Sequence, residues 1–204
     1  MSDTTTSEAV STTNVDDPEF AARIRERDAQ ALEEVVRRYL PQILRAAGGA
    51  GFAPELAEDI AQETFVTFIE TAHRFQGRSH VRTWLFGILY KKIAEARRSQ
   101  GRVNEMDDIE EVFERRFDNT GGWMRPPLPV DAEVYDAEVR QGIDGCLDRV
   151  PSSQRMAFVL REIEGMDTQE ICKILEITST NLGVLLYRVR NHLRECLEAK
   201  GIEP

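Results

Sequence analysis

The chain has 204 residues, of which 41% are hydrophobic and 30% charged. This is an ordinary balance for a globular protein, and the length suffices for one medium domain or two small helical ones. No apolar run approaches the roughly 20 residues of a membrane span, and the first residues lack the basic start and apolar core of a signal peptide. We therefore expect a cytoplasmic protein without a membrane-inserted segment. Its net charge of -10 argues against a protein that coats nucleic acid.

The charges are unevenly distributed along the chain. From Arg74 to Arg102, eight Lys and Arg stand against one acid, Glu95, for a net charge of +7. From Glu105 to Arg140, eleven Asp and Glu stand against four Arg, for a net charge of -7. A basic block beside an acidic one can provide a local phosphate-binding face on an acidic protein.

The N-terminal part predicts a tail followed by a helix. Residues 1–17 are rich in Ser, Thr and Asp, and we expect them to be disordered. Helical periodicity begins near Pro18 and continues to Leu44, with apolar residues spaced three and four apart. The glycine-rich run Gly48–Gly51 is expected to end that helix.

A second helix is predicted from about Pro54 to Ala72. Its buried face is expected to hold Leu56, Ile60, Phe65, Phe68 and Ile69. Its opposite face carries mainly acidic and amide side chains, namely Glu58, Asp59, Gln62 and Glu63. A charged helix face of this kind is more often simply exposed to solvent, so it indicates a binding surface only in combination with the motifs that follow.

The next segment combines rings and cations. Phe75–Ser79 is predicted to be a loop, Ser79 to cap a third helix from His80 to Ser99, and Gly101 to close it. The rings are those of Phe75, Trp84, Phe86 and Tyr90, and the cations are those of Arg74, Arg78, Arg82, Lys91 and Lys92. Neighbouring helix positions face different ways, so we expect one of Trp84 and Phe86 to belong to the core.

Residues 103–137 are expected to form an acidic linker with one short helix at Asp107–Phe117. Gly121, Gly122 and three prolines between 126 and 129 support this interpretation. The helical pattern returns from about Val134. We find neither strand-like alternation nor an internal repeat, and the fold class is therefore all-α, with two small helical domains joined by this flexible linker.

The C-terminal part predicts a helix-turn-helix. A short helix, Thr168–Leu175, is expected to begin with a capping box at Thr168, residues 176–178 form the turn, and Ser179 caps a helix through Leu197. The second helix is apolar on one face. Its outer face is small near the start and basic further along, which suits entry into a major groove. The alternative is an ordinary helical hairpin in a bundle.

Cys146, Cys172 and Cys196 lie far apart and form no C-x-x-C motif. We expect three reduced thiols within helices. His192 and Cys196, four residues apart, could share a metal ion, but two ligands do not make a site.

Several of these segments resemble one family. Residues 147–166, the helix-turn-helix and residues 187–197 are similar to region 4 of extracytoplasmic-function sigma factors of the sigma-70 family. Residues 57–65 resemble region 2.2 and residues 75–89 resemble regions 2.3 and 2.4. The match runs from Asp17 to the C-terminus in the right order, so 18–102 would be region 2, 103–137 the linker and 138–204 region 4.

The resemblance implies a promoter-reading subunit of RNA polymerase that is not an enzyme and needs no cofactor. The region 2.2 helix would dock on the coiled coil of the clamp in the largest core subunit through Asp59, Ile60, Gln62 and Glu63. The next segment would open and read the −10 element, with the side chains of Phe75, Arg78, Ser79, His80, Arg82, Trp84, Tyr90, Lys91 and Lys92. Region 4 would contact the core's flap and read the −35 element with Ser179, Thr180, Asn181, Val184, Tyr187, Arg188 and Arg190.

The resemblance also implies partners and control. An anti-sigma factor, of which zinc-binding forms are one kind, would cover both domains until an envelope or other stress releases them. The acidic linker with Trp123 would run toward the active-site and RNA-exit channels. One departure concerns Gly183, which removes a side chain from the recognition helix where the family often has a large or basic one.

Two rival interpretations remain at this level. A one-component helix-turn-helix regulator would explain the C-terminal part but not the ring-and-cation segment, and it would bind DNA without core polymerase. A helical enzyme would need a catalytic motif, and we find no phosphate-binding glycine loop, H-E-x-x-H motif or nucleophile elbow.

Overall fold

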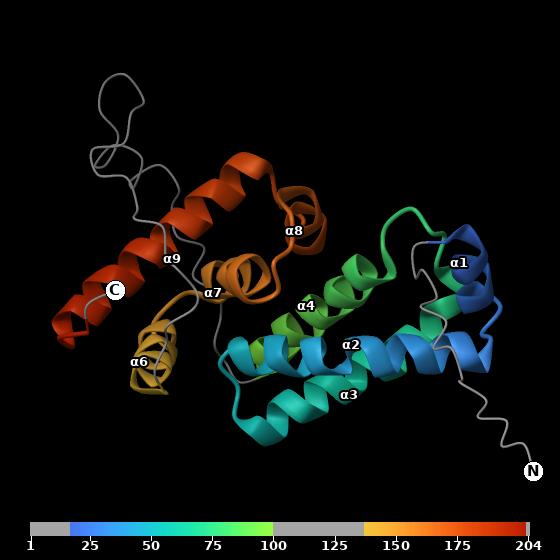
Figure 1. Ribbon diagram of the computed structural model, residues 1–204, viewed down its shortest axis with the longest axis horizontal. Coiled ribbons are helices and arrows are strands. Elements are labelled where there is room, and N and C mark those ends of the chain that lie inside the picture. Colours follow the sequence, from blue (N-terminus) through green and yellow to red (C-terminus); the bar gives the residue numbers. More distant parts are fainter. Residues whose placement is uncertain (1–16, 100–136, 203–204) are drawn as a thin grey trace, which may run out of the picture.

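The computed structural model describes residues 17–99 and 137–202, and Figure 1 shows these as two groups of helices lying against each other. Every regular element in these two ranges is helical, which confirms the all-α class. The predicted tail up to residue 16, the acidic linker, its short helix and Trp123 fall outside the described residues.

The N-terminal group begins with α1 (Pro18–Arg25) and α2 (Ala29–Gly49). The carboxylate of Asp28 caps α2 by accepting a hydrogen bond from the Ala31 amide at 2.9 Å, and it also accepts one from Arg23 at 2.6 Å. These two bonds, the backbone one first, lower the pKa of Asp28. Helix α2 ends at Gly49, as the glycine-rich run predicted.

Helices α3 (Pro54–Thr71) and α4 (Val81–Ser99), joined by a short 3-10 turn η1 (Ala72–Arg74), complete this group. Figure 1 shows α3 lying along α2, with α4 packed across the pair. Helix α4 begins one residue later than predicted. Two residues expected inside are not fully buried, since Leu56 is half-buried and Ile69 is 41% exposed.

The C-terminal group contains α6 (Ala137–Leu147), α7 (Ser152–Phe158), a π-helical turn η2 (Val159–Ile163), α8 (Thr168–Leu175) and α9 (Ser179–Ala199). The two caps differ by one residue from the prediction. Asp167, not Thr168, caps α8 in a reciprocal box with Glu170. Thr178, not Ser179, caps α9, because its hydroxyl accepts a hydrogen bond from the Asn181 amide.

The two groups share one apolar core. The larger cluster of buried side chains includes residues of α1 to α4 together with residues of α7, η2, α8 and the first half of α9. At one crossing point, the absence of a side chain on Gly49 matters, because an added Cβ would lie 3.0 Å from Cγ2 of Val159. A second, smaller cluster lies between α6 and the C-terminal half of α9.

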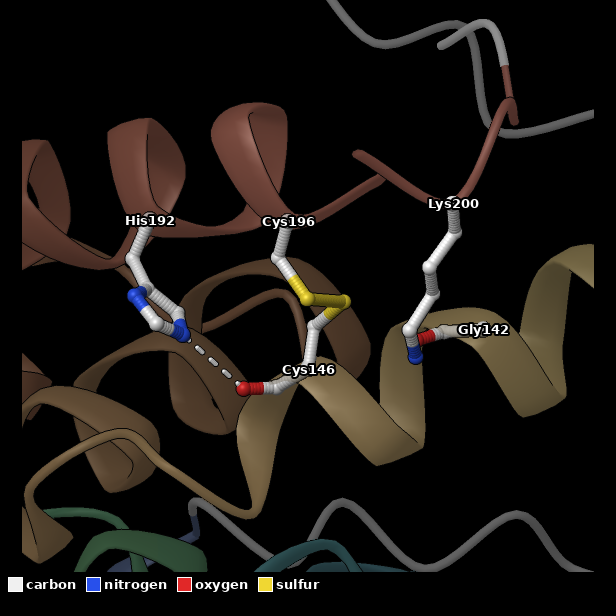
Figure 2. Close-up of a disulfide and its surroundings, with 5 residues drawn as sticks. All are labelled: Gly142, Cys146, His192, Cys196 and Lys200. Atoms are coloured by element: carbon white, nitrogen blue, oxygen red, sulfur yellow. Dashed lines mark hydrogen bonds between the residues drawn. A yellow bond between two sulfur atoms is a disulfide. The ribbon is translucent and has the colours of Figure 1, made fainter. Parts of the chain in front are cut away.

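Two of the three cysteines are joined, so the prediction of three reduced thiols is wrong for that pair. Figure 2 shows the disulfide between Cys146 on α6 and Cys196 on α9, with their Cα atoms 5.9 Å apart, and Cys172 is free. Helix packing joins residues 50 positions apart, which sequence spacing does not reveal. The Cys196 sulfur is bonded to Cys146 and is therefore not available to share a metal ion with His192.

Within the described ranges, no group of three or more His, Cys, Asp or Glu side chains is arranged to hold a metal ion. Among the same residues, no helix combines the length and apolar character that crossing a bilayer requires.

Candidate nucleic-acid interface

The acidic face of α3 lies on the surface. Asp59 and Gln62 are exposed, and Glu63 is exposed while pairing with Lys92 of α4 at 3.4 Å. Ile60 lies on the other side of the helix and is only 3% exposed. Ile60 therefore supports the stripe from within the core, and the surface available to a partner consists of Asp59, Gln62 and Glu63.

The loop between η1 and α4 lines a cleft of about 600 Å³. Arg78 and His80 are exposed and Ser79 is half-buried, and all three line the cleft. The backbone at Gly77 has φ +67°, a left-handed conformation that favours glycine. Helix α1 forms one wall and α8 another, so the predicted base-reading loop faces a surface of the C-terminal group.

The aromatic side chains of this segment are largely structural. Phe75 is 5% exposed and stacks on Trp84, with ring centroids 5.0 Å apart, and Trp84 meets Phe68 edge-on at 5.5 Å. Phe86 is fully buried, as expected for one of the two neighbouring rings. Trp84 is half-buried, but Phe75 is a core residue here, contrary to its predicted place on the DNA surface. Phe75 directly follows η1 and packs against Trp84 of α4.

Arg82 is held by the C-terminal group. Its guanidinium donates to the backbone carbonyl of Glu164 at 2.5 Å and lies 3.4 Å from the Glu164 carboxylate. The same carboxylate, whose side chain is 1% exposed, lies 3.4 Å from Arg45 of α2. The Glu164 carboxylate is buried, whereas the side chains of Arg45 and Arg82 are 54% and 23% exposed. Removing an arginine is costly because the buried carboxylate loses a partner. Glu164 therefore links two helices of one group to the loop after η2.

Further polar contacts follow along α4. Thr83 donates its hydroxyl proton to the Glu170 carboxylate of α8 at 3.1 Å, and Lys91 pairs with Glu176 at the end of α8 at 3.6 Å. Tyr90 is half-buried, and its burial, reinforced by the Glu176 carboxylate, raises its pKa above the usual 10.0. Helix α8 thus covers one side of α4.

Helix α9 presents its first turns differently. Ser179 and Thr180 are exposed, while Asn181, Val184, Tyr187 and Arg188 are half-buried. Arg190 forms an ion pair with Glu162, a residue of η2 in the same group. Gly183 is exposed with open space around it. The predicted face of the recognition helix is therefore continuous and partly accessible.

Sequence reasoning missed two features of this interface. Glu164 lies within a segment that resembles region 4, but nothing in the pattern distinguishes it from the neighbouring Glu162. The disulfide partner of Cys196 was equally hidden. The four-residue spacing of His192 and Cys196 was the one indication in the sequence, because it places both side chains on one face of α9. That face meets α6, but the spacing does not identify Cys146 as the partner.

The geometry defines a helical protein with an accessible helix-turn-helix in one group and a ring-and-cation helix in the other. Comparison with known proteins agrees. Residues 35–103 match the family model of sigma-70 region 2, and residues 140–193 match that of sigma-70 region 4. A Haemophilus influenzae protein named "Probable RNA polymerase sigma factor" is 34% identical over 154 residues, covering 72% of this chain and 79% of its own.

More distant relatives give the same picture. The ECF RNA polymerase sigma-E factor of Escherichia coli K12 is 24% identical over 177 residues, covering 85% of this chain and 90% of its own. Two solved structures share the fold at 20% identity. CnrH in complex with the cytosolic domain of CnrY covers 90% of this chain and 98% of its own at a TM-score of 0.64. The sigma factor RpoE in complex with the anti-sigma factor NepR from Bartonella quintana covers 81% and 96% at 0.61.

The chain belongs to the sigma-70 family of RNA polymerase sigma factors and is of the extracytoplasmic-function type. As a member of this family it binds core RNA polymerase and promoter DNA and directs the initiation of transcription.

Proposed function

We propose that this sigma factor uses three separate surfaces. The acidic stripe of α3, made of Asp59, Gln62 and Glu63, binds the clamp coiled coil of the largest core subunit. The segment from Arg78 to Lys92 reads and melts the −10 element, and the first turns of α9 read the −35 element while region 4 contacts the flap. The observation that supports this division best is the occurrence of both DNA-reading features, on α4 and α9, in one chain.

We infer further that the described arrangement is a closed one. Two residues assigned to the −10 surface are engaged by the C-terminal group, since Arg82 contacts Glu164 and Lys91 contacts Glu176. A third, Lys92, is paired within region 2, 3.4 Å from Glu63 and 3.6 Å from Glu95. Single-stranded DNA needs cations along its backbone and rings for its bases. Region 4 must therefore move off α4 before this segment can capture a melted strand.

The placing of this factor under an anti-sigma protein is part of the proposal. Two similarly folded proteins, CnrH and RpoE, were solved with CnrY and with the anti-sigma factor NepR, respectively. An anti-sigma protein that stabilised the contact between regions 2 and 4 would hold this chain inactive until an envelope or other stress acts. We place the protein in the cytoplasm, without catalytic activity of its own and without a cofactor.

The core-binding assignment is tested by a paired substitution. Asp59→Ala with Gln62→Ala is expected to lower affinity for core polymerase about tenfold, because two exposed polar contacts are lost while the buried face of α3 is untouched. The affinity is measured by fluorescence anisotropy of labelled chain titrated with core, and run-off transcription should fall in parallel.

The matched control is Glu33→Ala, which removes an exposed carboxylate from α2. This variant should bind core like the unchanged chain. Equal affinities for all three proteins, with unchanged circular dichroism spectra, would remove the acidic stripe from the core interface.

A further inference from the structure

The disulfide between α6 and α9 stands out in a protein that works beside RNA polymerase. Disulfides are rare inside most cells, where glutathione and thioredoxin keep thiols reduced, and those that occur there are mostly redox-sensing or catalytic. The Cα atoms of Cys146 and Cys196 lie 5.9 Å apart, within the usual range for a bonded pair. The packing of α6 on α9 thus places two cysteine sulfur atoms together, although the surroundings inside a cell tend to keep such thiols reduced.

We propose that Cys146 and Cys196 form a reversible redox pair. The pair is oxidised by a peroxide or a small-molecule disulfide and reduced by a dithiol, and its state sets the stability of the α6–α9 half of region 4. The consequence for transcription rests on the proposed role of α9 in reading the −35 element, since the bonded half and the DNA-reading half belong to the same helix.

The surroundings keep the two cysteines facing each other when the bond is open. Nε2 of His192 lies 3.1 Å from the carbonyl oxygen of Cys146, and Nζ of Lys200 donates to the carbonyl oxygen of Gly142 at 3.1 Å. Figure 2 shows these contacts on either side of the disulfide. His192, Cys196 and Lys200 follow one another at four-residue spacing, the first two on α9 and Lys200 as the residue that caps its C-terminus.

The apolar side chains add to this alignment. The small cluster between the two helices includes Leu147, Val150, Val189, Leu193 and Leu197. Two hydrogen bonds and this cluster remain after reduction, so the helices stay docked at room temperature, and re-oxidation needs no search for the partner. This is what separates a reversible pair from a bond that forms only once during folding.

The two sulfur atoms differ in access. Cys146 is fully buried and Cys196 is half-buried. The thiolate of Cys196 therefore attacks the peroxide first, forming a sulfenic acid as the O–O bond breaks and one water leaves. The thiolate of Cys146 then attacks that sulfur, and a second water leaves with the disulfide formed. In reduction, a dithiol attacks Cys196, Cys146 leaves as thiolate, and the second thiol of the dithiol releases Cys196.

The first experiment uses the full chain and needs no DNA. One sample of the purified protein is oxidised with hydrogen peroxide or oxidised glutathione, and another is reduced with dithiothreitol. Both are alkylated, and their masses are measured by mass spectrometry. The reduced chain should carry three alkyl groups and the oxidised chain one, on Cys172. Reduction should lower the melting temperature by about 8 °C or more, because the loop that the bond closes is long.

Matched variants assign the effect. Cys172→Ser should keep the whole melting shift, whereas Cys146→Ser and Cys196→Ser should melt at one temperature under both conditions. In a Cys172→Ser background, oxidised glutathione should label Cys196 of the Cys146→Ser variant at least about tenfold faster than Cys146 of the Cys196→Ser variant.

Two results would overturn the proposal. One is a bond that millimolar dithiol opens only after the chain has unfolded, which would make it a fixed crosslink. The other is an identical melting temperature for the oxidised and reduced chains. If both tests succeed and neither form binds a −35 duplex, the redox pair stands and the proposed role of α9 fails.

Discussion

Helices α4 and α9 are the two helices proposed to read DNA, and they differ in how far the rest of the chain covers them. The polar side of α4 is covered by the C-terminal group, where Arg82 contacts the carboxylate of Glu164 and Thr83 and Lys91 contact those of Glu170 and Glu176. The first turn of α9 is exposed at Ser179 and Thr180. Under the proposed roles, a closed chain of this kind could recognise a −35 duplex but could not hold an open −10 strand.

The substitution Glu164→Gln is expected to have the largest effect on this difference, because it should uncover α4. The glutamine keeps the shape but removes the charge that Arg45 and Arg82 share. Hydrogen bonds to charged groups contribute about 1.5–3 kcal/mol each, so the closed state should lose at least tenfold in population. Affinity of the free chain for a single-stranded −10 oligonucleotide should rise about tenfold, as measured by anisotropy.

Glu162→Gln is the matched control, because the ion pair between Glu162 and Arg190 lies entirely within the C-terminal group. It should leave −10 binding unchanged. Equal behaviour of the two glutamine variants would show that Glu164 does not hold the groups together.

The substitution Arg188→Ala tests the other helix, α9, and its proposed binding to the −35 duplex. Loss of an arginine that reads a base is expected to cost about 1–3 kcal/mol of duplex affinity. A −35 duplex should bind about tenfold more weakly, while the single-stranded −10 oligonucleotide binds as before. A matching loss for both DNAs would mean that the substitution acts through the fold rather than through the −35 contact.

A smaller effect is expected where the covering contact is exposed. Lys91 and Glu176 both have side chains at least 70% exposed, and such pairs contribute at most about 1 kcal/mol. Glu176→Gln should therefore raise −10 binding less than threefold, and this rise should vanish in high salt. An effect as large as that of Glu164→Gln would contradict the account, because the Lys91–Glu176 pair, and not the Arg82–Glu164 contact, would then hold region 4 on α4.

The smallest effect concerns pH. Burial, followed by the Glu176 carboxylate, raises the pKa of Tyr90 above its usual 10.0. The neutral phenol is thus favoured in the folded chain, and its contribution to stability is complete below pH 10 and is lost as pH rises through the raised pKa. Urea unfolding at pH 9 and pH 11 should show a smaller alkaline loss for Tyr90→Phe than for the unchanged chain. Identical losses would argue against this burial.

Much of this architecture could be predicted from the sequence, and the exceptions share a cause. Hydrophobic periodicity located α3, α8 and α9 to within two residues, because each helix is amphipathic along its own length. It predicted a single helix from near Pro18, whereas the structure has two, α1 and α2, that are separated at residues 26–28. The caps shifted by one residue because Asp167 and Thr178 precede side chains of similar capping ability. These differences are local and leave the fold unchanged.

The larger misses concern which surface of the molecule each residue reaches in the folded chain. Phe75 was predicted to face DNA but stacks on Trp84, and Ile60 was included in a surface that it supports from inside. Glu164 and the Cys146–Cys196 bond join residues 50 or more positions from their partners. Periodicity reports which face of a helix is apolar, but it does not report which other helix will cover the polar face.

The central claim, that region 4 covers α4 in the free chain and leaves it in the holoenzyme, is tested most directly by zero-length carbodiimide crosslinking. The chain needs no substitution, because Lys91 and Glu176 lie 3.6 Å apart across the two groups, and Lys92 and Glu95 lie 3.6 Å apart within α4 as an internal reference. In the free chain both links should be found by mass spectrometry. On binding core polymerase, before any promoter is added, the Lys91–Glu176 link should fall at least tenfold relative to the Lys92–Glu95 link. A Lys91–Glu176 link that persists undiminished in a transcriptionally active complex would contradict the account.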